Sequence, residues 1–189
     1  MANTDAAFGF RPYRHATGGQ VRMNEYSIAS AYNTNIFNGD VVEMTGTGKN
    51  IAKVAAANAD NIGVFAGCRY VDASGNQVFS KYWPANTVAT DIKAYVFDDP
   101  NIIFECQCDT LAEADIGQQV DINVGTGSTL TGVSGAYADV GAGTGTTGDP
   151  FRIIELSPAV DNEYGAYARA LVMFSEHVLK GVVSGVGGI

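Results

Sequence analysis

Short apolar stretches separated by turn residues recur along most of the chain. Gln119–Val124 alternates strictly, with Val120 and Ile122 on one face and Asp121 on the other. Alternation with a period of two predicts a half-buried β-strand rather than a helix.

Further strands are predicted where β-branched and aromatic residues are bounded by Gly, Pro, Asn or Asp. The predicted segments are Glu25–Phe37, Val41–Met44, Ile51–Val54, Ile62–Val71, Gln77–Tyr82, Asp91–Phe97, Ile102–Cys108, Phe151–Leu156 and Tyr167–Phe174. Leu111–Ile116 indicates one short helical turn. About ten short strands at hairpin spacing predict an all-β fold, an antiparallel β-barrel or β-sandwich, with an extended N-terminal arm.

Two hairpins are predicted from the turns. Asp72–Asn76 joins the strands on either side of it, and the four-residue turn Asp98–Asn101 joins the following two strands. Gly63 and Gly67, inside one predicted strand, indicate a bulge or a close approach of backbone.

The chain divides into three stretches by composition, the second of which contains a distinct Gly- and Thr-rich segment. Residues 1–24 are predicted to be an arm and residues 25–180 a β-rich body. Within the body, residues 125–149 hold 8 Gly and 6 Thr in 25 positions, which indicates a surface loop or a pair of weak strands. The Gly-rich residues 181–189 are expected to form a flexible C-terminal tail.

The arm has an unusual composition for a free tail. Phe8, Phe10 and Tyr13 are interleaved with Arg11 and Arg14, whereas disordered segments contain few aromatics. On an extended segment Phe8 and Phe10 point to one side, so we expect them to fill one pocket while Arg11 faces outward. These five residues are our candidate partner-binding residues.

Amino-acid usage agrees with the strand pattern. The chain of 189 residues has 19 Val and 12 Ile against 5 Leu, a bias typical of pleated sheets. This length fits one domain that needs no disulfide or metal to fold.

Charge is unevenly distributed. The net charge is −9, yet residues 1–22 carry +2 and residues 91–163 carry −11. This favours an arm that docks on an acidic surface, although an acidic body is also typical of ordinary solubility. An acidic body argues against nucleic acid as a partner, and no stretch is apolar enough to predict a membrane span.

The cysteines do not indicate a metal site or a disulfide framework. Cys68, Cys106 and Cys108 are odd in number, and Met1–Phe10 lacks the apolar core of a secretory signal. Cys106 and Cys108 are interpreted as small core residues, because a zinc site needs about two more ligands. We expect free thiols in a reducing cytoplasm.

Candidate catalytic groups are few. His15 and His177 lie near opposite ends of the chain and are expected to be solvated or at an interface. Asp98-Asp99 and the acids of Asp109–Asp115 are interpreted as solvated turn acids, and Trp83 as a core residue. The sequence therefore predicts no enzyme, no catalytic residue, no cofactor and no metal.

Two runs of residues resemble a family of tailed-bacteriophage virion proteins. The first is Ala2–Gly19, with Asp-Ala-Ala-Phe-Gly-Phe-Arg-Pro-Tyr-Arg-His; the second is Ile62–Asp99, with Gly-Val-Phe-Ala-Gly-Cys and Val-Phe-Ser-Lys-Tyr-Trp-Pro. The family is that of capsid decoration (cement) proteins, and the similarity extends over about the first 110 residues. Residues 125–149 have no counterpart in it.

The resemblance implies a virion structural protein that is made in the host cytoplasm and binds the outside of the phage head. It implies the major capsid protein and sister copies as partners, as a homotrimer or, alternatively, a dimer. Competing interpretations are another virion component, such as a tail or fibre-base protein, a small-ligand-binding β-barrel, or a hydrolase.

Overall fold

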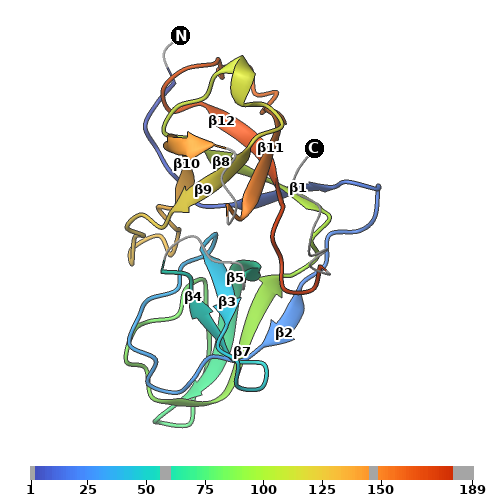
Figure 1. The fold of residues 1–189 in the computed structure, drawn as a ribbon. Helices are drawn as coiled ribbons and strands as arrows, with labels where there is room; N and C mark the ends of the chain where they lie inside the picture. Colours follow the sequence, from blue (N-terminus) through green and yellow to red (C-terminus); the bar gives the residue numbers. More distant parts are fainter. Residues whose placement is uncertain (1–2, 56–60, 145–148, 181–189) are drawn as a thin grey trace.

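The computed structural model describes residues 3–55, 61–144 and 149–180 (Figure 1). Within them the chain forms twelve strands and one 3₁₀ turn, η1, so the predicted all-β antiparallel fold is confirmed. The elements are β1 (Arg11–His15), β2 (Asn24–Tyr26), β3 (Val41–Met44), β4 (Ile51–Lys53), β5 (Asn61–Asp72), β6 (Gln77–Ser80), β7 (Ala89–Phe97), β8 (Ile102–Gln107), η1 (Glu113–Asp115), β9 (Gln119–Asn123), β10 (Tyr137–Thr144), β11 (Phe151–Leu156) and β12 (Arg169–Phe174).

The strands form two sheets that occupy the upper and lower parts of Figure 1. Sheet A has the order β1-β8-β12-β11-β9-β10. Sheet B has the order β2-β7-β5-β3-β4, and β6 pairs with the second half of β5.

Each sheet curls back on itself and is closed by an isolated bridge. In sheet A the residue after β8, Cys108, bridges Ala138 of β10. In sheet B the residue after β2, Ser27, bridges Asn50 just before β4. Both sheets are therefore barrel-like, and β1 and β6 are the strands that extend outside the closed parts.

Sheet A encloses an aromatic core. Phe151 stacks on Phe174 with ring centroids 4.3 Å apart, and Phe104 meets Phe174 edge-to-face at 5.6 Å. Such pairs add specific geometry to the burial of large apolar area. The interior of this barrel is thus filled by side chains.

Sheet B lies between this core and a second one. In β3, Val41 belongs to the first core and its neighbour Val42 to the second; in β5, Val64 and Phe65 divide in the same way. Because successive side chains of a strand point to opposite faces, two adjacent apolar residues can serve two cores.

The first predicted hairpin is confirmed. β5 and β6 pair antiparallel across the turn that contains Asp72. The predictions for Gly63 and Gly67 are also confirmed. A Cβ on Gly63 would lie 2.2 Å from the carbonyl oxygen of Phe97, and the register of β5 with β7 shifts between Phe65 and Gly67.

The second predicted hairpin is wrong. β7 pairs with β5 and β2 in sheet B, whereas β8 pairs with β12 and β1 in sheet A. The turn between them carries the chain from one sheet to the other. Its Asp98 is buried and accepts hydrogen bonds from the side chains of Tyr26 and Asn24, so it was wrongly interpreted as a solvated turn acid.

Other predictions have mixed outcomes. η1 confirms the helical turn predicted within Leu111–Ile116. The segment 125–149 contains β10, and the predicted tail 181–189 lies outside the described residues. The predicted arm contains β1, which pairs with β8 of the same chain.

Candidate functional site

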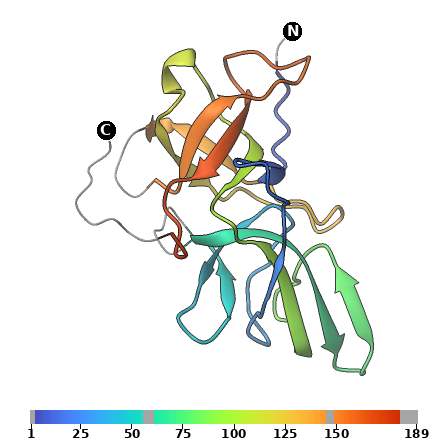
Figure 2. The same cartoon turned by 90° about the vertical axis from the view of Figure 1, so that its right-hand side faces the viewer.

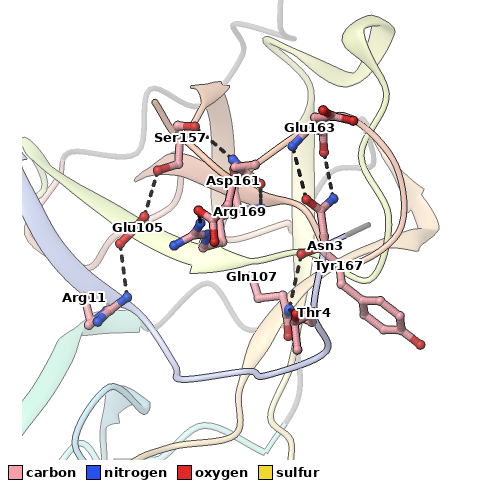
Figure 3. Close-up of polar contacts among 11 residues, drawn as sticks. Asn3, Thr4, Arg11, Glu105, Gln107, Ser157, Asp161, Glu163, Tyr167 and Arg169 are labelled. Carbon is pink, nitrogen blue, oxygen red and sulfur yellow. Dashed lines mark hydrogen bonds and ion pairs between the residues drawn. The ribbon is translucent and has the colours of Figure 1, made fainter. Parts of the chain in front are cut away.

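The N-terminal segment lies across the outer side of sheet A, held by a buried glutamine (Figure 3). The side-chain amide of Gln107 donates to the carbonyl oxygens of Thr4 at 2.8 Å and Tyr167 at 3.2 Å. Its side-chain oxygen accepts from the backbone of Ala6. Gln107 thereby joins the N-terminal segment to the loop that precedes β12.

Asn3 forms a second set of hydrogen bonds between the N-terminal segment and the loop that precedes β12. The Asn3 side chain donates to the carbonyl oxygens of Glu163 and Ala166 and accepts from the Glu163 backbone (Figure 3). We call the surface formed by residues 3–14 and 157–169 the N-terminal face.

Both arginines of the predicted partner-binding set pair with carboxylates of the same chain. Arg11 contacts Glu105 at 3.2 Å, and Arg14 contacts Glu155 at 3.2 Å. Glu105 also accepts from the Ser157 hydroxyl at 2.7 Å. The acidic surface on which Arg11 and Arg14 dock is therefore the chain's own body.

The aromatic residues of the set do not share a pocket. Phe10 is buried and stacks on Phe151 with centroids 4.5 Å apart. Phe8 is only partly buried, and the Arg11 guanidinium carbon lies over its ring, 3.8 Å from the ring centroid. Gly9 lies between them with φ +76°, a left-handed conformation that ends the regular alternation expected of an extended segment.

A surface cavity of about 280 Å³ opens in the N-terminal face. Its lining comes from both the segment and the loop: Asn3, Thr4, Ala6, Phe8, Arg11, Gln107, Asp161, Tyr167 and Arg169. Arg169 pairs with Asp161 at the cavity wall. The lining combines amide, hydroxyl, aromatic and paired charged groups.

The N-terminal face carries three exposed tyrosines, of which Tyr167 lines the cavity. Tyr13 is 47% exposed, Tyr164 44% and Tyr167 41%. Tyr167 has φ +59°, a conformation that costs a non-glycine residue roughly 1–2 kcal/mol. Tyr and Arg are enriched at protein interfaces, and backbone strain is concentrated at functional sites.

The predicted core residues are confirmed. Cys106, Cys108 and Trp83 are buried, and burial raises the pKa of the Cys106 thiol well above its usual value. Within the described ranges no cluster of three His, Cys, Asp or Glu side chains could hold a metal ion.

Neither histidine is solvated. His15 is mostly buried and lies 3.0 Å from the Asp99 carboxylate. His177 is buried against Phe174, and desolvation lowers its pKa.

Sequence reasoning missed one buried ionic cluster. Asp40 is fully buried, contacts the Lys53 ammonium at 3.1 Å and accepts from the Ser134 hydroxyl at 2.6 Å. It also accepts from the Phe37 backbone at 2.7 Å. The only signal was Asp40 in an Asn-Gly-Asp turn, which predicts a turn but no partner.

Comparison of the chain with protein-family models, curated proteins and solved structures found no match. Among the described residues no helix is long and apolar enough to cross a membrane.

Proposed function

We propose that the chain is a virion structural protein that binds the outside of a tailed-phage head and stabilises the shell through its N-terminal face. The observation that carries the proposal is a surface cavity lined by Arg11, Tyr167 and Arg169, in a face that also exposes Tyr13 and Tyr164. Aromatic and arginine side chains of this kind dominate binding energy at protein interfaces.

The resemblance to decoration proteins also supports a binding role for the N-terminal face. One of its two runs, Ala2–Gly19, includes the segment that crosses sheet A. The other run, Ile62–Asp99, spans β5 to β7 in sheet B.

The buried polar groups also favour a structural role. Gln107 holds the N-terminal segment, and Asp40 joins Lys53 to Ser134. In both places the polar atoms bond to groups of the same chain, an arrangement that stabilises a fold.

A small-ligand-binding barrel receives less support. Phe10, Phe104, Phe151 and Phe174 fill the interior of sheet A. A tail or fibre-base protein remains the second candidate, because it would use the same kind of surface.

The test uses heads of the phage that encodes the chain, assembled without it. We expect the purified protein to cosediment with heads and to appear on the shell lattice in electron micrographs. Density only along the tail or at one vertex would favour the second candidate.

A double variant, Tyr13→Ser with Tyr167→Asn, tests the face itself. Asparagine tolerates the left-handed backbone at residue 167. Head binding should weaken about tenfold or more, the loss expected when interface aromatics are removed. Val88→Ser changes an exposed residue just before β7 of sheet B; it is the control and should bind normally. Equal binding by both variants would exclude the N-terminal face.

A further inference from the structure

Two strands of the described fold extend outside the closed sheets, and they differ in how their free edges are protected. An open strand edge presents unpaired N–H and C=O groups, which natural proteins block with charge, proline or a bulge. β1 has all three: Arg11 and Arg14, Pro12, and a register shift between Pro12 and Arg14.

β6 has none of them. Its sequence is Gln77-Val78-Phe79-Ser80, without charge or proline, and its pairing with β5 is continuous. Phe79 is 71% exposed. Figure 2 shows the hairpin of β5 and β6 projecting at the lower right, with β6 outermost.

The ladder indicates which backbone groups of β6 face outward. Asp72 donates its N–H to the Asn76 carbonyl, so these residues form a hydrogen-bonded pair. Bonded and non-bonded pairs alternate along an antiparallel ladder. Val78 and Ser80 therefore bond to β5, while the N–H and C=O groups of Gln77 and Phe79 face the free edge.

We propose that β6 pairs with β6 of a second copy of this chain about a twofold axis, which joins sheet B of the two molecules into one continuous sheet. Antiparallel strand addition at an edge is a general mode of association. A twofold contact is self-complementary, because each surface meets itself.

The register follows from the side chains. Directly opposite residues of an antiparallel pair share one face. With Phe79 opposite Phe79 of the second copy, the two residues exchange both backbone bonds and their rings become neighbours. A cross-strand aromatic pair is among the favourable ones.

Charge favours a second copy as the occupant. The net charge is −9, yet the paired strands place no like charges opposite each other. In the antiparallel pair the end of β6 of one copy meets the start of β6 of the other, so Lys81, in the bend after β6, would lie near the other copy's hairpin loop, which contains Asp72. Hydrogen bonds from Asn76 lower the pKa of the Asp72 carboxyl, so Asp72 is anionic near neutral pH.

This inference does not depend on the proposed function, and its test needs only the purified chain. Sedimentation velocity over a concentration series should show a reversible dimer of twice the 19.8 kDa mass. Phe79→Lys should raise the dimer dissociation constant about tenfold or more, because a charge at an edge blocks strand pairing. Leu130→Lys changes a 94% exposed apolar residue elsewhere and should leave the dimer intact.

Oxidative cross-linking tests the register. Phe79→Cys should form a disulfide-linked dimer, whereas Gln77→Cys should not, because in this register residue 79 lies opposite residue 79 of the second copy and residue 77 does not lie opposite residue 77. A wild-type chain that stays monomeric or forms a trimer would overturn the proposal. So would a Phe79→Lys variant that dimerises normally, or equal cross-linking of the two cysteine variants.

Discussion

At some positions of this chain no side chain larger than glycine fits, because backbone of another strand lies against the residue. Gly63 is the clearest case: it has φ +154°, and a Cβ there would also lie 2.8 Å from a Val96 methyl. Gly75, in the loop between β5 and β6, has φ +83° but nothing within 4 Å of a Cβ. A comparison of alanine substitutions at the two glycines therefore distinguishes steric overlap, which occurs only at Gly63, from backbone strain, which occurs at both.

Gly63→Ala should lower the free energy of unfolding by about 3 kcal/mol or more, because the β5–β7 ladder must separate to admit the methyl group. Gly75→Ala has strain alone and should cost about 1–2 kcal/mol. Urea denaturation of both variants at constant m-value measures the difference. Equal losses would show that the close approach to Phe97 does not matter.

His177 makes stability depend on pH. Burial lowers its pKa in the folded state below the unfolded value near 6.5. Lys180 lowers the pKa further, and Asp98 and Asp99 act in the opposite direction. Between the two pKa values the unfolded chain binds more protons, so stability falls as pH drops below about 6.5.

The measurement is the free energy of unfolding of wild type and His177→Gln between neutral and mildly acidic pH. Wild type should lose more stability than the variant over this interval. His15 is present in both proteins, so any contribution that it makes cancels in the comparison. Parallel curves for the two proteins would contradict the assignment of this pH dependence to His177.

At the scale of elements, β1 shows how a segment that looks like an arm becomes part of the fold. Its strand pairs with β8, and Phe10 just before it enters the core of sheet A. Phe8, two residues earlier, is only partly buried. The aromatic content of the segment was visible in the sequence, but its division into one core ring and one surface ring was not.

Phe10→Ala should destabilise the fold by about 3–5 kcal/mol, the usual cost of removing a buried Phe. Phe8→Ala is the matched control and should cost less than about 1 kcal/mol, because its ring is packed mainly under Arg11. Thermal and urea unfolding compare the two. Similar small losses would show that the N-terminal segment is not part of the stable core.

The main prediction that proved wrong, the second hairpin, also concerns how the elements are arranged. The turn Asp98–Asn101 has the residues of a hairpin turn, yet the strands on its two sides belong to different sheets. Turn residues determine that the chain reverses or bends, while strand pairing depends on partners such as β12, which lies far along the chain. A local signal contains no information about that partner.

At the scale of the whole molecule, a buried ionic cluster links the two sheets beside their shared apolar core. Asp40 precedes β3, Lys53 ends β4, and Ser134 lies in the loop before β10 of sheet A. Because the pair is buried away from water, its charges must be compensated by ionic contacts and hydrogen bonds within the protein.

Lys53→Met should destabilise the protein by about 3–5 kcal/mol, because it leaves the Asp40 carboxylate buried without its cation. The double variant Asp40→Asn with Lys53→Met removes both charges and should recover part of that loss, giving a coupling energy of about 1 kcal/mol or more. Urea unfolding of the two single variants and the double variant completes the cycle. Additive effects would indicate that the pair is not coupled.

The sequence alone determined the all-β class, the positions of most strands, the helical turn and the burial of Cys106, Cys108 and Trp83. These features follow from side-chain period, β-branched content and turn residues, which act over a few neighbouring positions. Only the tertiary structure decided that there are two curled sheets with two cores, that Arg11 and Arg14 pair with Glu105 and Glu155, and that Tyr167 lies beside the N-terminal segment. The physical reason is that these contacts join residues far apart in the chain, and their energies depend on which surfaces the folded sheets bring together.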